Sequence, residues 1–245
     1  MPHADAEEAR ARFIELFPAG FEEVERSNLV ELVAYTDPDT EQSLKRGFAQ
    51  VAAEDVEPGW EERWREFHRP LRVGRVWIVA PWHLRPSDGP CVVVDPGRAF
   101  GTGGHASTRL CLQLLQQVAF GSFLDVGCGS GVVAIAAAQL GFEPVVAVDV
   151  DEHAVEATVR NARANGVVLR AFRADARTAA LPAADVAVAN LTRELVERIV
   201  PRLECRLVIT AGYLEADDPQ PTGFTRVQRL GEDGWAADLL ERVAQ

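Results

Sequence analysis

The chain of 245 residues lacks the sequence features of exported proteins, of membrane-spanning proteins and of small proteins stabilised by zinc or disulfides. No apolar run approaches the roughly 18–20 residues that a membrane helix needs, and the first residues lack the basic-then-apolar pattern of an export signal. The four cysteines lie far apart and form no CxxC pair, so neither a zinc ribbon nor a disulfide scaffold is expected. We therefore expect a cytoplasmic protein without a membrane segment.

Lysine is also nearly absent. Lys45 is the only lysine, and the other 24 basic residues are arginines. The net charge is −12, and residues 1–70 account for −9 of it. An acidic surface repels nucleic acid and favours a basic partner, although the same charge can serve solubility alone. We expect a basic protein partner, no direct nucleic-acid binding and a monomer.

The first 58 residues have the pattern of a small α+β domain. Its predicted elements are a helix over 7–17, strands over 21–25 and 29–35, and a helix over 40–53. Trp60, Trp64 and Phe67 then recur at helical spacing, which predicts a linking helix whose aromatic side chains serve packing. Short strands are predicted over 76–80 and 91–94. The expected organisation is a small acidic substrate-recognition domain (1–58), a linker helix with a lead-in strand (59–90) and a larger domain (91–245).

From about residue 107 helices and strands alternate. Helices are predicted over 107–118, 131–140, 152–164 and 193–200, and strands over 122–126, 144–149, 167–172, 184–189 and 206–211. Two further strands, 224–230 and 235–243, form a terminal hairpin. This alternation predicts an α/β fold, a Rossmann-like, doubly wound and mostly parallel sheet with a C-terminal antiparallel hairpin.

A glycine-rich turn joins the first strand of this sheet to a helix. Gly127, Gly129 and Gly131 permit a sharp turn and let a ligand lie against the main chain, and Asp125 precedes them by two residues. Asp149 ends the next strand, where a carboxylate can accept both hydroxyls of a ribose. A purely structural role for this turn is the alternative.

The spacing of the glycines separates nucleotide types. A dinucleotide fingerprint needs glycine at position 132, which is Val132 here. An acid at Asp125 suits a ligand with a cationic amino-acid end better than a pyrophosphate. The pattern resembles that of S-adenosylmethionine-dependent methyltransferases. Asp175, after the following strand, is placed either to meet an adenine amino group or to stabilise a turn.

A second constellation precedes the sheet, in a loop of small and hydroxyl residues over 95–108 that is able to wrap a ligand. It contains Phe100, Thr102 and His105, and Ser107 or Thr108 is expected to begin a helix. His105 has no second ligand at metal-binding spacing, so no metal site is expected. Thr108 can cap the helix, contact a cofactor carboxylate, or do both.

A third constellation is Asn190, at the carboxyl end of a strand of the sheet, the edge where ligands bind in doubly wound folds. Its amide offers one acceptor and two donors to an amine beside a methyl donor, and the alternative is a cap for the helix over 193–200. Leu191 and Thr192 stand where enzymes that methylate adenine amines have two prolines, which argues against a nucleobase substrate.

Together these motifs resemble the ribosomal protein L11 methyltransferase (PrmA) family. The resemblance rests on the segments Ala99-Phe100-Gly101-Thr102-Gly103, Asp125 to Gly131, Asp149-Val150-Asp151 and Ala189-Asn190-Leu191, and it runs from about residue 60 to 214. It implies an acidic recognition domain, a linker helix and a Rossmann-like catalytic domain that methylates lysine side chains and the N-terminal amine of that ribosomal protein. Cofactor contacts then fall on Thr108, Gly127, Asp149 and Asn190.

The chain departs from the family pattern at the start of the recognition domain, where an expected first strand is absent. That departure leaves open a methyltransferase for another protein lysine or for a small molecule. A non-catalytic cofactor-binding module is a separate alternative, and the intact glycines and Asp149 argue against it. For the main hypothesis we expect Asn190 to orient the acceptor amine, Phe100 and the glycine turn to exclude water, and His105 to help remove a proton. No covalent intermediate is expected, since no cysteine is placed to form one.

Overall fold

The computed structural model describes residues 9, 13, 22–26, 29–34, 36, 38–48, 51–53, 69–94 and 104–243. Backbone contacts divide the chain into two compact units, Met1–Trp64 and Arg65–Gln245, and each is described here by itself. Trp60, Trp64 and Phe67 of the predicted linking helix lie outside the described residues, and the predicted domain bounds stay a prediction.

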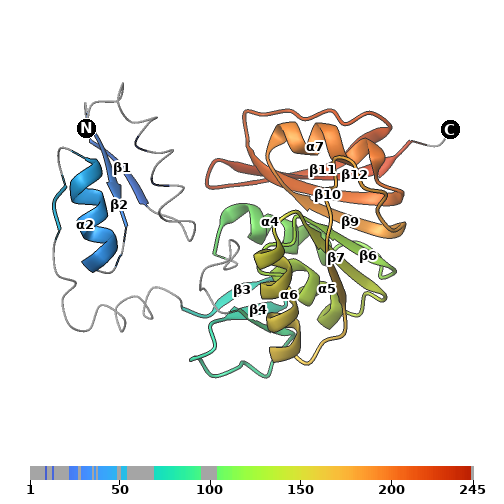
Figure 1. The fold of residues 1–245 in the computed structure, drawn as a ribbon. Coiled ribbons are helices and arrows are strands. Elements are labelled where there is room, and N and C mark those ends of the chain that lie inside the picture. Colours follow the sequence, from blue (N-terminus) through green and yellow to red (C-terminus); the bar gives the residue numbers. More distant parts are fainter. Residues whose placement is uncertain are drawn as a thin grey trace. The chain divides into compact units, whose positions relative to one another are not determined.

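The first unit contains a hairpin followed by a helix (Figure 1). Strand β1 (Glu22–Arg26) pairs antiparallel with β2 (Leu29–Val33), so both predicted strands are present, although β2 ends two residues before its predicted end at residue 35. Helix α2 (Pro38–Gly47) ends at Gly47, so its predicted extension to residue 53 was wrong. Glycine has a low helix propensity, and the apolar spacing beyond it was not enough to continue the helix.

Phe13 and Leu44 form a buried apolar cluster in this unit. The ring of Phe13 meets that of Phe48 edge to face, with 5.6 Å between centroids, a favourable aromatic geometry. Ala9 and Phe13 are helical and buried, and the other positions of the predicted helix over 7–17 lie outside the described residues.

The second unit contains a seven-stranded sheet, a three-stranded sheet and four α-helices among its described residues. The elements of the larger sheet and its helices are α4 (Ala106–Leu115), β6 (Phe123–Val126), α5 (Val132–Leu140), β7 (Val145–Asp149), α6 (Glu152–Ala164), β8 (Arg170–Arg173), β9 (Ala184–Asn190), α7 (Arg193–Ile199), β10 (Cys205–Leu214), β11 (Phe224–Glu232) and β12 (Trp235–Arg242). A short 3-10 turn, Val200–Arg202, follows α7.

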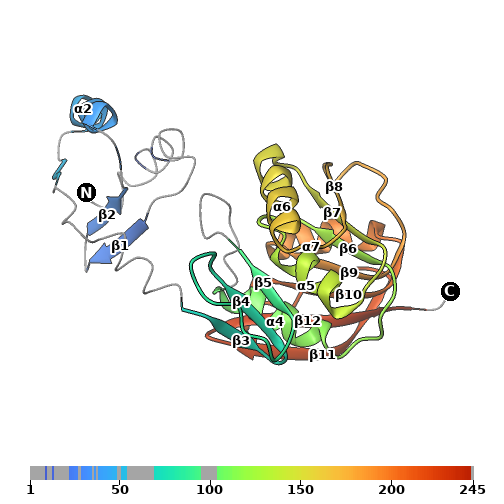
Figure 2. The same ribbon diagram turned by 90° about the horizontal axis from the view of Figure 1, so that it is seen from below.

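The strand order is β11-β12-β10-β9-β6-β7-β8. Strands β10, β9, β6, β7 and β8 run parallel, and β12 is antiparallel to both β10 and β11. Helices α4, α5 and α6 cover one face of the sheet, and α7 covers the other (Figures 1 and 2). The predicted doubly wound fold with a terminal antiparallel hairpin is therefore confirmed.

The small sheet consists of β3 (Leu71–Val73), β4 (Val76–Val79) and β5 (Cys91–Val93). Strand β3 was not predicted, because three residues are too few to establish a period-two pattern. Gly74, at φ 58°, forms the tight turn between β3 and β4. This sheet lies beside α4 in Figure 2, and its apolar side chains join the core under α4 and α5.

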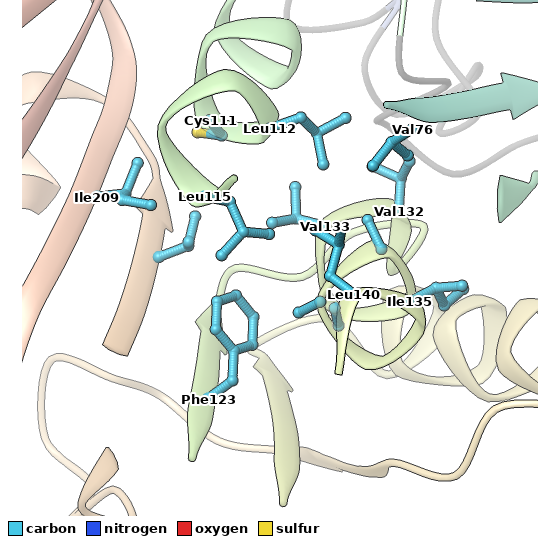
Figure 3. Close-up of a cluster of buried hydrophobic side chains, with 14 of the residues drawn as sticks. Val76, Cys111, Leu112, Leu115, Phe123, Val132, Val133, Ile135, Leu140 and Ile209 are labelled. Atoms are coloured by element: carbon cyan, nitrogen blue, oxygen red, sulfur yellow. The ribbon is translucent and has the colours of Figure 1, made fainter. Parts of the chain in front are cut away.

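Figure 3 shows part of that core, a single cluster to which α4 contributes Leu112 and Leu115, α5 contributes Val133 and Ile135, and β6 contributes Phe123. Burial of each such side chain stabilises the fold by roughly 1.5–3 kcal/mol. The packing fixes α4 and α5 against the sheet, and therefore fixes the turns that precede both helices. No helix among the described residues combines the length and apolar character needed to cross a membrane.

Several boundaries of the larger sheet and its helices differ from prediction; helix α4, for example, ends at Leu115 and not at residue 118. Strand β8 begins at Arg170 and not at residue 167, because Gly166 adopts φ 65° and the chain is still turning. Strand β10 continues to Leu214 through a bulge at Gly212, so its predicted end at residue 211 was three residues early. Helix α4 begins at Ala106, before both predicted starts.

Candidate active site

The glycine turn between β6 and α5 has the conformation that its sequence predicts. Gly127, Gly129 and Gly131 have φ of 78°, 53° and 81°, a left-handed region that L-residues with side chains rarely adopt. A Cβ atom on Gly131 would also come within 2.8 Å of the Thr158 side chain. Glycine is therefore required here by conformation and, at Gly131, by space.

The backbone donors of the turn bond to the end of β7. Gly127 and Cys128 donate to the carbonyl of Val148 at 2.8 and 3.1 Å, and Gly129 donates to Oδ2 of Asp149 at 3.0 Å. These three N–H groups are satisfied within the protein, whereas a pyrophosphate site needs donors that face the ligand. The geometry agrees with the prediction that the turn does not hold a dinucleotide.

Asp149 stands half-buried at the carboxyl end of β7. Its Oδ2 accepts from Gly129 and its Oδ1 from the N–H of Asp151 at 3.0 Å. A carboxylate has about four lone-pair sites, so these two bonds orient the group and leave acceptor capacity on both oxygens. The remaining acceptor sites of the carboxylate therefore fit the pair of hydroxyls of a ribose.

Asp125 is only 3% exposed and lies below the first turn of α5. Its Oδ2 accepts from the N–H of Ala134 at 3.1 Å, and it does so where the helix N-cap, Gly131, has no side chain. Burial raises the pKa of Asp125 to about 7, and the charge of Asp149 acts in the same direction. Asp125 thus has a structural bond, and its expected contact with a cofactor's amino-acid end stays a prediction.

Asn190 and Thr108 come from distant parts of the chain and meet at this edge of the sheet. Nδ2 of Asn190, the last residue of β9, lies 3.5 Å from Oγ1 of Thr108, which is 2% exposed on α4. The N-cap of α7 is Thr192, so the alternative that Asn190 caps this helix is wrong. Two residues predicted separately as cofactor contacts are thus brought together.

His105 is the N-cap of α4, which corrects the prediction of Ser107 or Thr108 as the helix start and of Thr108 as its cap. Nδ1 of His105 accepts from the N–H of Ser107 at 3.3 Å, and its ring meets Trp235 edge to face at 4.6 Å. Burial, followed by the charge of Arg109, lowers the pKa of His105. The imidazole is therefore neutral near pH 7.

The sequence analysis missed Arg109. Its Nε lies 3.0 Å from Glu232 Oε1, its Nη2 lies 2.6 Å from Asp233 Oδ2, and Nη1 donates to the carbonyl of Gly104. The side chain thus ties α4 and the segment before it to the turn between β11 and β12. No local signal could have shown this, because Arg109 and Glu232 are 123 residues apart.

Asp175 stabilises a turn, as one of its two predicted roles requires. Its Oδ1 accepts from the N–H of Arg177 at 2.9 Å, and the guanidinium of Arg177 pairs with both oxygens at 2.8 and 2.9 Å. This hydrogen-bonded pair lowers the pKa of Asp175 to about 2. An adenine contact by Asp175 stays a prediction.

Phe100 and Thr102 lie outside the described residues. The described part of the chain contains no group of three or more His, Cys, Asp or Glu side chains arranged to hold a metal ion. A doubly wound sheet in which one strand, β12, is reversed, a glycine turn without free pyrophosphate donors and an acid at the end of the next strand define the Rossmann-like methyltransferase class.

Comparison with known proteins gives the family. The model of the ribosomal protein L11 methyltransferase (PrmA) family matches residues 7–216. The chain belongs to this family, and the resemblance seen in its motifs is confirmed.

Individual relatives agree with this assignment. The L11 methyltransferase of Caldicellulosiruptor bescii is 35% identical over 78% of this chain and 67% of its own length. That of Dechloromonas aromatica is 41% identical over 69% of this chain, and the match spans 58% of the relative. The solved structure of an L11 methylase from Lactobacillus delbrueckii subsp. bulgaricus is 25% identical, with a TM-score of 0.63 over 71% of this chain and 98% of that one.

Proposed function

We propose that this chain transfers a methyl group from S-adenosylmethionine to amines of ribosomal protein L11, on lysine side chains, the N-terminus, or both. The family match and the names of its relatives support the substrate. The observation that carries the proposal is the meeting of Asn190 and Thr108, 3.5 Å apart, at the carboxyl end of the strand beside the glycine turn.

The described residues fit the cofactor, which supplies an activated methyl group on a sulfonium. Asp149 would accept the ribose hydroxyls through the lone pairs that Gly129 and Asp151 leave unused. Gly127 and Gly129 would contact the cofactor through their main chain, and Thr108 would donate its hydroxyl to the cofactor carboxylate. Phe100, Thr102, Asp125, Gly131 and Asp175 complete the proposed contacts.

The chemical demand on the protein is to present a neutral amine. A lysine amine has a pKa near 10.4 in water, and exclusion of water lowers that value because it disfavours the ammonium. Oδ1 of Asn190 would accept an N–H of the amine and so direct its lone pair, while Thr108 holds the other end of the amide. His105, kept neutral by burial and Arg109, would accept the proton that the amine loses; the proton would go to Nδ1, its lone-pair nitrogen, which would then release the N–H of Ser107.

The distribution of charge and the free cysteines support the proposed partner, oligomeric state and compartment. The acidic excess of residues 1–70 favours a basic protein substrate over nucleic acid and a soluble monomer. Free cysteines at Cys91, Cys111, Cys128 and Cys205 favour a reducing compartment such as the cytoplasm.

The test is a mass-spectrometric methylation assay. The purified chain and labelled S-adenosylmethionine are added to ribosomal proteins from a strain that lacks this gene, and we expect label on L11 alone. Asn190→Ala should lower kcat about 100-fold and raise the cofactor Kd by a smaller factor, since Asn190 would contact both the amine and the cofactor and misplacement of a reacting group acts mainly on the rate. Thr192→Ala is the matched control, because Thr192 is two residues away and makes no side-chain capping bond.

Label on another protein would retain the methyltransferase and overturn the substrate. Cofactor binding without label on any protein would favour a small-molecule substrate. If the chain does not bind S-adenosylmethionine, the proposed activity is wrong and the non-catalytic alternative is favoured.

A further inference from the structure

Leu191, the residue after Asn190, is held against the bulge of the neighbouring strand. Its N–H donates to the carbonyl of Ala211 at 2.8 Å. Gly212 follows Ala211 with φ 95°, and a Cβ atom there would lie 2.5 Å from the carbonyl oxygen of Leu191 and 3.0 Å from its nitrogen. The main chain at Gly212 is thus in direct contact with the main chain of Leu191, and only glycine permits this approach.

The side chain of Leu191 extends to the glycine turn. A Cβ atom on Gly127 would meet Cδ2 of Leu191 at 2.6 Å, so this leucine covers the first glycine of the turn. The position of the Leu191 backbone therefore affects two parts of the site. It sets the direction of the preceding residue, Asn190, and it sets how the turn is covered.

A buried polar cluster fixes the bulge itself. The pairing of β10 with β12 shifts register between Ala211 and Tyr213. The hydroxyl of Tyr213 lies 2.7 Å from Oγ1 of Thr210 and donates to Oδ2 of Asp238 at 2.9 Å. All three of these side chains are at most 2% exposed, so their bonds hold the chain on both sides of Gly212.

We propose that Gly212 is a positioning residue for the acceptor site: its bulge seats the backbone of Leu191 and thereby aims the amide of Asn190 at the methyl acceptor. This inference rests on the proposed function of Asn190. Nothing in the local sequence around Asn190 supplies this constraint, since Gly212 lies on the next strand of the sheet.

The test is Gly212→Ala in the full chain, with Gly141→Ala as the matched control. Gly141 has φ 104°, similar to that of Gly212, but a Cβ atom there would meet nothing within 4 Å. Both variants should lose a few °C of Tm from left-handed strain. We expect kcat on L11 to fall roughly 10- to 100-fold in Gly212→Ala alone, with the S-adenosylmethionine Kd within about 3-fold of the parent.

Equal kcat values in the two variants would overturn the inference, because strain without the contact to Leu191 would then explain the result. If Gly212→Ala fails to fold, kcat of Tyr213→Phe tests the inference instead. This variant keeps the aromatic ring and removes the hydroxyl whose hydrogen bonds hold the bulge. We expect about a 3- to 10-fold lower kcat there with unchanged cofactor Kd, and a parental kcat would sink the proposal.

A spectroscopic measurement separates this inference from the proposed function. The side-chain amide resonance of Asn190, assigned by its loss in Asn190→Ala, should shift in Gly212→Ala and not in Gly141→Ala. A parent chain without activity on L11 would contradict the proposed function, and this resonance would still report whether Gly212 aims the amide. An unshifted resonance in Gly212→Ala would contradict the positioning role itself.

Discussion

The carboxylate of Asp149 accepts a hydrogen bond from the backbone N–H of Gly129 at 3.0 Å, so the acid that ends β7 also holds the glycine turn after β6. The two residues are 20 positions apart in the sequence. One side chain therefore couples the shape of the turn to the proposed ribose contact.

Replacement of Asp149 by alanine should weaken cofactor binding. Hydrogen bonds to a charged group contribute about 1.5–3 kcal/mol each, so loss of the ribose contacts should raise the S-adenosylmethionine Kd at least about 10-fold. Isothermal titration calorimetry measures this. Asp185→Ala is the control, because Asp185 bonds Ser122 near the start of β9, at the opposite end of the sheet. Equal Kd values for the two variants would contradict the ribose role.

The stability of the fold should depend on the ionisation of Asp125. Burial raises its pKa from the usual 3.8 to about 7. Between these values the folded chain keeps a proton that the unfolded chain releases, so the stability contributed by this group is lost as pH rises toward and through 7. Asp125→Asn removes the titration and should therefore gain stability relative to the parent by up to about 4 kcal/mol between pH 4 and pH 8.

Urea unfolding of both proteins across this pH range measures the difference. Asp185→Asn is the control, because Ser122 lowers the pKa of Asp185 and its carboxyl is ionised in both states above pH 5. A constant difference between Asp125→Asn and the parent would show that Asp125 is already ionised in the fold.

His105 combines a capping role with the proposed proton acceptance, and two substitutions separate them. Asparagine is a good N-cap, so His105→Asn should keep the free energy of unfolding within about 0.5 kcal/mol, whereas His105→Ala should lose about 1 kcal/mol. Because neither residue accepts a proton near pH 7, both variants should lower kcat about 10-fold or more. Stopped-time methylation assays and urea unfolding give the two quantities. Full activity of His105→Asn would assign His105 to capping alone.

The acidic residues of β1 should contribute to substrate recognition. The triple change of Glu22, Glu23 and Glu25 to glutamine should lower kcat/KM on L11 about 3- to 10-fold at low salt, with a smaller effect at high salt, because charges steer association with a basic partner and salt screens this attraction. The cofactor Kd should not change.

A triple change on the second unit tests whether net charge alone is responsible. Glu143, Glu152 and Glu156 are exposed there, and their replacement by glutamine alters the net charge equally. If both triple variants lost the same kcat/KM, net charge alone would explain the effect, and the acidic residues of β1 would serve solubility and not substrate recognition.

Local patterns predicted most elements of the second unit. Helix α6, residues 152–164, has the predicted bounds, because its amphipathic spacing and its Asp151 cap are both encoded within a few residues. The glycine turn and Asp149 were likewise predictable, since left-handed φ values and a strand-ending acid leave direct marks in the sequence. Strand β3 was not predictable because it has only three residues, and the end of β10 was predicted too early because a bulge interrupts the strand at Gly212.

The sequence by itself therefore determined the succession of helices and strands, the glycine turn that we propose as part of the cofactor site, and the family. Only the tertiary structure decided that Asn190 meets Thr108, that Arg109 binds Glu232 and that Leu191 lies between Gly127 and Gly212. Secondary structure follows from periodicity over a few residues, whereas these contacts join strands and helices distant in the sequence. They form because the strand order places the carboxyl ends of β6, β7 and β9 at one edge of the sheet, under α4 and beside β10.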